Sequence, residues 1–244
     1  MQKTPLIELC NISYTYPHNH TPILKNLNFS VFEKNVGIIG SNGCGKTTFF
    51  QIIVGLLVPD KGQLVFQGTS VKDKADLRAL RKEVGFLFQN SDDQLFSPTV
   101  IEDVAFGPLN LGFDPAAARE IAMETLDDLG LSGFEERVTH KLSGGEKKLV
   151  ALATILAMKP KMLLLDEPTN NLDPETRGRL IGILQRLDLY QIIISHDWDF
   201  LSQTNSILYQ IEHGHIHRCE EDHIHVHSHI HKAGDHPHRH DLKH

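Results

Sequence analysis

The chain has 244 residues, of which 40% are hydrophobic, which suits one large α/β domain or two small ones. Its formal net charge of −7 argues against a general nucleic-acid binder, which normally carries a basic surface, so we expect no nucleic-acid partner. The cysteines Cys10, Cys44 and Cys219 form no CxxC pair, which argues against a disulfide framework and favours a reducing compartment.

The first part of the chain predicts a series of short strands, at residues 6–16, 23–32, 36–40, 64–67 and 84–89. The first two bracket a Pro-His-Asn-His-Thr-Pro turn and are expected to be antiparallel. The third is an apolar run that ends in a glycine-rich loop. A helix is expected after this loop, over residues 46–57.

In the second part, predicted helices and strands alternate. A helix is expected over 114–131, with Asp114 as its cap and Pro115 at its first position. Another is expected over 143–159, where Ser143 and Glu146 have capping-box spacing. A fully apolar strand, a helix and a second apolar strand follow, at 162–166, 173–189 and 191–195.

This alternation indicates an α/β protein with a mostly parallel central sheet, preceded by an antiparallel β subdomain. The helix-rich middle, about residues 91–158, is expected to form a helical subdomain. Residues 1–218 are expected to form one domain. We expect 219–244 to be a flexible tail, because twelve of the 16 histidines fall at or after His213 and apolar periodicity almost disappears.

No stretch predicts a membrane span. The N-terminal residues lack the layout of a signal peptide. The longest apolar stretch, 149–158, is about half of the roughly 20 residues needed to cross a bilayer. Any membrane association is therefore expected to be peripheral.

Residues 40–47 fit the phosphate-binding pattern G-x-x-x-x-G-K-[ST]. The glycines let backbone N–H groups turn toward an anion, and the following helix adds its positive N-terminal end. Lys46 is expected to reach the β- and γ-phosphates of ATP, and the Thr47 hydroxyl to bind Mg²⁺. A chance glycine loop is disfavoured because the motif lies between a predicted strand and a predicted helix. The predicted ATP-binding residues of this segment are Gly40, Ser41, Asn42, Gly43, Cys44, Gly45, Lys46, Thr47 and Thr48.

The apolar strand at 162–166 ends in Asp166 and Glu167, at the sheet edge where ligands bind in α/β folds. Asp166 is expected to hold Mg²⁺, mainly through water, and Glu167 to orient and deprotonate the attacking water. Many strands end in acids, and it is the phosphate loop that makes the assignment specific. His196 follows the next apolar strand. A lone histidine there is more often structural, but this strand end converges on the same edge, so His196 is expected to contact the γ-phosphate.

With these motifs, the chain resembles the ABC ATPases over about residues 5–218, which implies a P-loop NTPase fold of ABC type. The decisive piece is the segment 142–146, Leu-Ser-Gly-Gly-Glu, which looks like the signature sequence of that family. The resemblance implies a homodimer in which the signature of one subunit closes on ATP held by the phosphate loop of the other. Without the resemblance, this segment would be interpreted as an ordinary helix cap. The signature residues are Ser143, Gly144, Gly145 and Glu146.

The resemblance gives roles to three further residues. Gln89 resembles the glutamine that contacts Mg²⁺ and water and links the site to the helical subdomain. Asp173 resembles the aspartate that communicates across the dimer. Tyr16 resembles the aromatic residue that stacks on adenine, although an edge-strand aromatic in a packed sheet is an open alternative.

Some positions depart from the family pattern. Lys34 and Asn35 stand where Gly-Glu is usual, and Leu149 replaces a commonly basic residue. Cys44 occupies a loop position that is usually small and inert, and we interpret it as a packed residue. None of these departures removes a catalytic group.

Residues 88–100 and 102–108 look like energy-coupling factor importers, with the cobalt/nickel group as the nearest match. In that family two ATPase subunits sit under a membrane coupling protein and a separate substrate-capturing membrane protein. The resemblance therefore places the chain at the cytoplasmic face of the cell membrane, as a peripheral subunit. We expect a groove that receives a coupling helix, in which acidic residues pair with an arginine. A solvated loop is an equal alternative for any one of its residues, which are Asp92, Asp93, Leu95 and Phe96.

The tail has three interpretations: a metal-binding segment, a cloning tag and a solvated linker. Irregular spacing and flanking Asp and Arg residues argue against a tag. Imidazole suits Ni²⁺, Cu²⁺ and Zn²⁺, and alternate histidines of an extended chain favour a loose metal buffer over a structured site. The candidate ligands for Ni²⁺ or Co²⁺ are His223, His225, His227, His229 and His231.

Three classes of function compete: a transport motor, a soluble ABC ATPase of DNA repair or translation, and a metal-storage or metal-delivery protein. One cassette, an acidic balance and the lack of a long insertion favour the motor. Its cargo is expected to be nickel or cobalt, with a vitamin, an amino acid or another ion as the alternative. An ATPase subunit does not touch the cargo, so its sequence bears on the cargo only through the family likeness and the tail.

Overall fold

An antiparallel sheet opens the fold in the computed structural model, which describes residues 4–219. Within them, four strands pair in the order β2-β1-β4-β5. Along β1, buried side chains alternate with half-buried ones on either side of an irregularity at Cys10 and Asn11, as expected for a sheet with one face on the core. The strands are β1 (Ile7–Tyr14), β2 (Leu24–Ser30), β4 (Lys61–Phe66) and β5 (Thr69–Ser70).

The second sheet carries the strand ends that are predicted to bear the site. Its order in the described part of the chain is β10-β9-β3-β8-β7-β6, and all neighbours are parallel except β9 and β10. The parallel strands therefore end at the same edge. The strands are β3 (Asn35–Ile39), β6 (Val84–Leu87), β7 (Met162–Asp166), β8 (Tyr190–Ile194), β9 (Ile207–Glu212) and β10 (His215–Arg218).

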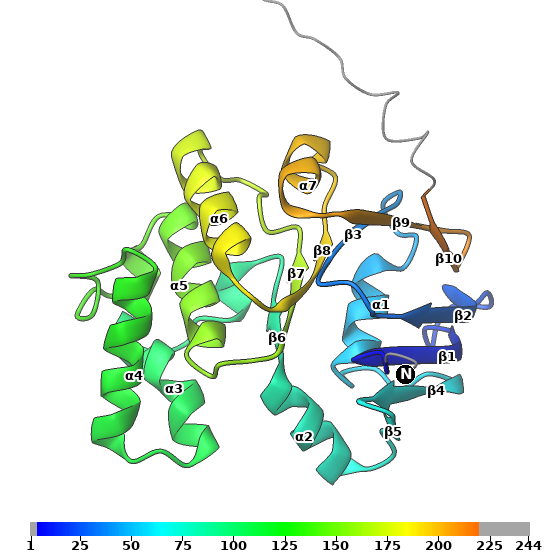
Figure 1. Cartoon of the computed structure of the whole chain (residues 1–244), viewed down its shortest axis with the longest axis horizontal. Helices are drawn as coiled ribbons and strands as arrows, with labels where there is room; N and C mark the ends of the chain where they lie inside the picture. Colours follow the sequence, from blue (N-terminus) through cyan, green and yellow to red (C-terminus); the bar gives the residue numbers. More distant parts are fainter. Residues whose placement is uncertain (1–3, 220–244) are drawn as a thin grey trace, which may run out of the picture.

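Helices cover this sheet and extend beyond it (Figure 1). Single 3-10 turns occur at Ser91–Asp93 and Thr139–Lys141. The α-helices are α1 (Lys46–Ile53), α2 (Lys74–Glu83), α3 (Val100–Leu111), α4 (Pro115–Asp128), α5 (Gly144–Leu156), α6 (Pro174–Arg186) and α7 (Trp198–Thr204).

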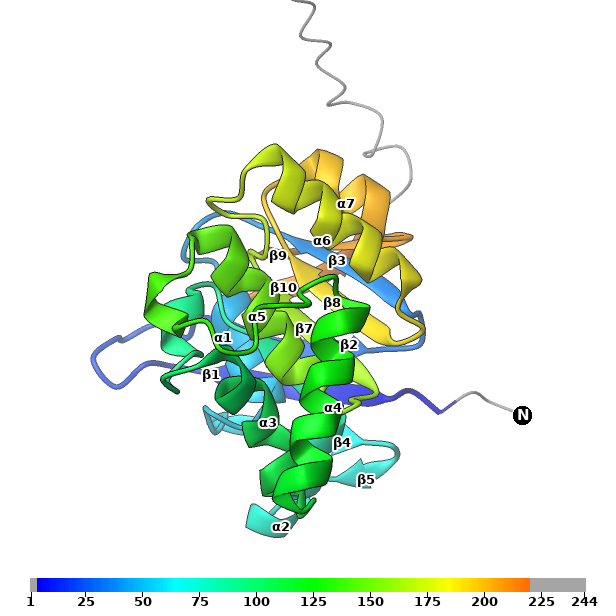
Figure 2. The same ribbon diagram turned by 90° about the vertical axis from the view of Figure 1, so that its left-hand side faces the viewer.

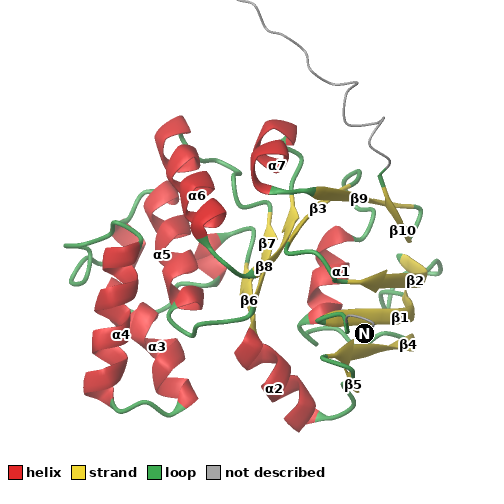
Figure 3. Ribbon diagram, viewed as in Figure 1, coloured by secondary structure: helices red, strands yellow, loops and turns green. Residues whose placement is uncertain are grey.

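The two faces of the central sheet bury different cores. Leu163 and Leu165 of β7 pack with side chains from α3 to α6, whereas Met162 and Leu164 pack with α1 and the antiparallel sheet. This division follows from the two-residue period of a strand, which makes both faces of β7 apolar. Figure 3 shows α1 between the two sheets. In Figure 2, α4 and α5 stand in front of the strands, on the side away from the antiparallel sheet.

The expected fold class is confirmed: a mostly parallel sheet, an antiparallel β subdomain and a helical region containing α3, α4 and α5. Directly after β10, the Cys219 amide donates to the Leu208 carbonyl at 2.8 Å. The sequence reasoning did not place α2, α3, α7, β5, β9 or β10. None of the helices within residues 4–219 is long and apolar enough to cross a membrane.

Candidate functional site

The phosphate-loop motif forms a tight loop between β3 and α1. Gly43 and Gly45 have φ angles of 76° and 108°, a region that favours glycine. At Gly45 a Cβ atom would also come within 2.8 Å of the Leu24 side chain. The Lys46 ammonium donates to the carbonyls of Gly40 at 2.7 Å and Ser41 at 3.1 Å. The loop therefore wraps around the lysine that begins α1.

Thr47 and Asp166 bring the loop and β7 together. The Thr47 hydroxyl donates to Oδ2 of Asp166 at 2.8 Å. Asp166 is only 2% exposed. Burial raises the pKa of this carboxyl, while the Thr47 hydrogen bond and the charges of Lys46 and Lys148 oppose the shift. A hydroxyl and a carboxylate thus face the same point at the end of the sheet.

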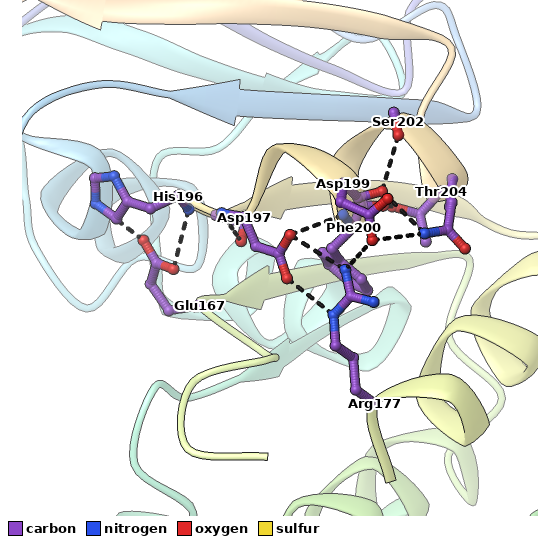
Figure 4. A network of polar contacts seen from close by, with 10 residues as sticks. Glu167, Arg177, His196, Asp197, Asp199, Phe200, Ser202 and Thr204 are labelled. Carbon is purple, nitrogen blue, oxygen red and sulfur yellow. Dashed lines mark hydrogen bonds and ion pairs between the residues drawn. The ribbon is translucent and has the colours of Figure 1, made fainter. Parts of the chain in front are cut away.

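Glu167 and His196 form the next pair along this edge (Figure 4). Nε2 of His196 lies 3.2 Å from Oε1 of Glu167, and the His196 amide donates to Oε2 at 3.3 Å. Burial raises the pKa of the Glu167 carboxyl, and the neighbouring His196 opposes this shift. The same Nε2 atom lies 3.2 Å from Nζ of Lys46, so the imidazole stands between an ammonium and a carboxylate.

Glu167 also has an unusual backbone. Its φ angle is 47°, in the left-handed region that costs energy for a residue with a side chain. Its amide donates to the Ile194 carbonyl at 2.9 Å, which ties it to β8. The residue is 6% exposed. The carboxylate is consequently held in a defined direction.

These groups line a cavity of about 570 Å³ at the carboxyl end of the sheet. Ile23 and Asn170 line it too, and the sequence reasoning missed both. Asn170 could have been found from its position three residues after Glu167. Ile23 could have been found because it follows the same turn that Tyr16 precedes. The predicted residues that line the cavity are Tyr16, Asn42, Gly43, Gly45, Lys46, Thr47, Thr48, Gln89, Asp166, Glu167 and His196.

Gly40, Ser41 and Cys44 belong to the loop but not to the cavity lining. Cys44 is half-buried and packs against the core below the loop, as expected. A Cβ atom on Gly40 would meet its sulfur at 2.7 Å. These three residues therefore contribute to the shape of the loop without lining the cavity.

Tyr16 closes the cavity from the antiparallel sheet. Its hydroxyl is 2.9 Å from Oγ1 of Thr48, and its ring makes an edge-to-face contact with Tyr14 at 5.0 Å. Tyr16 lies two residues after β1, where it packs against the core and also lines the cavity. Its position is therefore compatible both with a packing role and with contact to adenine.

The signature segment lies away from this cavity. Ser143 caps α5, and its amide donates to Glu146 at 2.8 Å, which completes the expected capping box. Ser143 and Gly144 are exposed. Asp173 likewise caps α6, accepting from the amides of Glu175 and Thr176. None of these residues lines the cavity of its own chain.

A buried lysine that the sequence reasoning did not single out links α5 to the site. Lys148 is 3% exposed and donates to the carbonyls of Phe88 at 3.2 Å and Gln89 at 2.8 Å. Gln94, six residues after Phe88, accepts from the Phe88 amide and donates to the Ala151 carbonyl of α5 at 2.9 Å. The segment that carries Gln89 is therefore fastened to the helix that begins with the signature.

The tail histidines from His223 to His231 lie outside the described residues. Within residues 4–219, no group of three or more His, Cys, Asp or Glu side chains is arranged to hold a metal ion.

A model of the ABC transporter family matches residues 24–170. The chain belongs to this family. It is therefore an ATP-binding and ATP-hydrolysing subunit of a transporter, as the motifs indicated.

Proteins of similar sequence and structure are also described as ATP-binding proteins or parts of ABC transporters. A Nitratidesulfovibrio vulgaris protein described as an ABC transporter ATP-binding protein is 52% identical over 97% of this chain and 86% of its own length. The energy-coupling factor transporter ATP-binding protein EcfA of Methanothermobacter thermautotrophicus is 49% identical over 81% of this chain and 65% of its own length. The structure of CbiO1 from Clostridium perfringens, part of the ABC transporter complex CbiONQ, is 32% identical with a TM-score of 0.77, covering 88% of each chain.

Proposed function

We propose that this chain powers an energy-coupling factor importer, and that its cargo is nickel or cobalt ions. The observation that carries the importer class is the joint similarity to EcfA and to CbiO1, together with a cavity that is lined by Lys46, Asp166 and Glu167. The nickel or cobalt cargo rests on the likeness of residues 88–100 and 102–108 to the cobalt/nickel group. The alternative is an importer for a vitamin or another small solute, with an incidental tail. A soluble ABC ATPase of DNA repair or translation and a metal buffer are the less favoured classes.

In this proposal ATP occupies the cavity of about 570 Å³. The N–H groups of the loop and of the first turn of α1 face the phosphates, and Lys46 adds a positive charge. Tyr16 contacts the adenine from the antiparallel sheet.

The residues present fit Mg²⁺. Thr47 and Asp166 offer oxygen ligands, which Mg²⁺ prefers, and their oxygens already lie 2.8 Å apart. Gln89 lines the same cavity and supplies a third oxygen. When bound, the ion neutralises negative charge on the phosphates.

Glu167 is the proposed general base. It accepts a proton from water as the water oxygen forms a bond to the γ-phosphorus, and the bond from that phosphorus to the bridging oxygen breaks, giving ADP and phosphate. Its raised pKa improves it as a proton acceptor. His196 is proposed to hold the γ-phosphate beside Lys46 while its backbone orients Glu167.

The active unit is proposed to be a homodimer. Ser143 and Gly144 are exposed at the N-terminus of α5, where N–H groups and the helix dipole favour an anion. Because the signature lies outside the cavity of its own chain, ATP contact requires a second subunit. Asp173, at the start of α6, is proposed to act across this interface.

A groove in the helical subdomain is the proposed docking site for a helix of the membrane coupling protein. Its volume is about 390 Å³, and Asp92, Leu95 and Phe96 line it, whereas Asp93 does not. Phe96 is 66% exposed and makes an edge-to-face contact with Phe106 at 4.8 Å. An exposed aromatic pair beside a carboxylate suits a helix that presents an apolar face and an arginine.

Asp92 already has a partner within the chain. Lys147 of α5 contacts its Oδ1 atom at 2.6 Å, and both residues line the groove. An arginine from the coupling helix would therefore share or replace this ion pair. Since Lys147 neighbours Lys148, the groove connects directly with the helix that holds Gln89.

Charge reversal tests the groove. Lysines at Asp92 and Asp93 should abolish co-purification with the membrane coupling protein, whereas lysines at Asp127 and Asp128, an adjacent acidic pair of α4, should not. Intact assembly with the first pair would count against the groove. The location of the chain at the cytoplasmic membrane face follows from this docking.

Nickel and cobalt uptake by the source cells tests the cargo. The wild type is compared with Glu167→Gln and with a variant in which His223, His225, His227, His229 and His231 become Ser. Loss of uptake of either metal in Glu167→Gln supports metal import. Unchanged uptake of both metals would leave the ATPase in place but overturn the metal cargo in favour of another solute. Metal binding by the tail itself should weaken below about pH 6.5, when imidazole protonates.

A further inference from the structure

Arg177 of α6 is joined to the segment that follows β8. Its Nε and Nη2 atoms donate to the two oxygens of Asp197 at 2.9 and 3.2 Å, and Nη2 also reaches Asp199 at 2.7 Å (Figure 4). A two-pronged guanidinium–carboxylate pair fixes orientation as well as distance. The Arg177 side chain is 24% exposed and that of Asp197 is 32% exposed. Solvent therefore screens this pair less than a fully exposed one.

Asp197 directly follows His196. Its Oδ1 atom also accepts from the Phe200 amide at 2.9 Å, at the start of α7. On the other side, the His196 amide donates to Glu167 at 3.3 Å. The backbone that carries the imidazole is thus fastened both to α6 and to the end of β7.

The same turn of α6 contacts the signature helix. A Cβ atom on Gly145 would lie 2.9 Å from Oγ1 of Thr176, the residue before Arg177. Asp173 accepts from the Thr176 amide and hydroxyl at 3.0 and 2.7 Å. The first turn of α6 therefore touches the signature segment, the predicted dimer loop and the segment of His196.

We propose that Arg177 is a positioning residue for ATP hydrolysis. It acts through Asp197, whose carboxylate it fixes, and thereby holds the His196 ring against Glu167. The inference concerns the hydrolytic step and holds for any transport cargo. The competing explanation is that the ion pair only fastens α6 to α7. The two explanations differ because misplacement of His196 slows the chemical step, whereas looser packing lowers stability and leaves the rate of the folded enzyme unchanged.

The test uses the full chain with Arg177→Gln, Arg177→Lys and a matched control, Arg119→Gln. Arg119 pairs with Glu136 at 3.1 Å on the exposed surface of the helical subdomain. Steady-state hydrolysis gives kcat and KM, a fluorescent ATP analogue gives the affinity, and thermal unfolding gives Tm. We expect kcat of Arg177→Gln to fall by roughly tenfold to a hundredfold. The KM and ATP affinity should change by less than about threefold. Arg177→Lys, which keeps the charge but loses the fork, should be intermediate, and Arg119→Gln should match the wild type.

A double-mutant cycle with Asp197→Asn tests the route. If Arg177 acts through Asp197, the double variant should be no slower than the slower single variant. Additive losses in kcat would overturn that route. A wild-type kcat in Arg177→Gln, or a loss that disappears after correction for the folded fraction, would overturn the proposal as a whole. If Arg177→Gln does not fold, Arg177→Lys decides: a reduced kcat at unchanged affinity supports the proposal, and a wild-type kcat contradicts it.

Discussion

The Nε2 atom of His196 lies 3.2 Å from Oε1 of Glu167, although the two residues lie on different strand ends and 29 positions apart. The second oxygen of the same carboxylate accepts from the His196 amide. Glu167 is therefore held by both the ring and the backbone of one neighbour. Its left-handed φ angle of 47° adds to this constraint, because the strained backbone leaves few directions for the side chain.

His196→Ala should lower the rate of ATP hydrolysis by roughly a hundredfold, the scale on which a positioned group contributes to proton transfer and phosphate stabilisation. Binding of ATP should persist, because the loop and Lys46 remain. Phosphate release and the affinity for a fluorescent ATP analogue check this, with His217→Ala of the exposed β10 as control. A His196→Ala enzyme with wild-type turnover would contradict the assigned role.

Asp166→Asn should raise the Mg²⁺ concentration that is needed for half-maximal nucleotide binding by about tenfold or more, because the amide lacks the negative charge that attracts the ion. Titration of nucleotide binding with Mg²⁺ measures this. Thr47→Val, which removes the hydroxyl bonded to Asp166, should shift the titration in the same direction. Unchanged titrations in both variants would show that the ion binds elsewhere.

Lys148 should make stability depend on pH above neutrality. Burial lowers its pKa to about 8 from an ordinary 10.5, and the Asp166 charge opposes the shift. Between these values the unfolded chain binds a proton that the folded chain has lost, so the free energy of unfolding rises with pH. The shift corresponds to roughly 3 kcal/mol.

Lys148→Met removes this titration and keeps a side chain of similar length. The wild type should therefore gain stability relative to the variant as pH rises from 8 to 10.5. Urea unfolding across this range measures the difference, with Lys141→Met on the exposed surface as control. A constant difference between wild type and Lys148→Met would show that Lys148 does not titrate there.

Glu146 should stabilise the start of α5 above pH 4.5. Hydrogen bonds from the Ser143 amide and hydroxyl hold the pKa of Glu146 below its ordinary 4.5, partial burial opposes the shift, and Arg137 favours it. Because the folded pKa is the lower one, this contribution is complete above 4.5 and is lost as pH falls through the folded value. Glu146→Ala should cost on the order of 1 kcal/mol at pH 7. The cost should shrink below pH 4, and an equal cost at pH 3 and pH 7 would refute the assignment.

Most residues that line the cavity could be named from the sequence because they lie in short motifs at strand ends. Each motif lies at the end of an apolar run that predicts a buried strand, and parallel strands end at one edge of a sheet. The motifs are the phosphate loop, Asp166 with Glu167, and His196. Once the sheet is known to be parallel, the position of each motif at a strand end is enough to predict that the motifs lie close together.

Two of the elements that were not placed, α2 and β10, contain few buried apolar residues. In α2 only Leu80 is fully buried, so the capping box of Asp73 and Asp76 was the available signal. β10 lies in a histidine-rich stretch with one half-buried apolar residue, Ile216. Helix α3 begins at a second capping box, formed by Thr99 and Glu102.

Contacts between side chains of different helices and strands are the third kind of feature that could not be predicted from the sequence. Arg177 and Asp197 meet because α6 packs beside α7 and their side chains turn toward one another. Lys148 reaches the carbonyl of Gln89 across a gap of 59 residues. Neither pair leaves a local pattern, so only the packed structure identifies them.

The most direct test of the account is phosphate release by the purified full chain, comparing wild type with Glu167→Gln at saturating ATP and Mg²⁺. The amide keeps the shape of the carboxylate but cannot accept the proton from water. We predict that Glu167→Gln binds ATP as tightly as the wild type and releases phosphate at least about a hundredfold more slowly. Phosphate release at the wild-type rate would contradict the account, because the proton would then have to leave by a group other than Glu167.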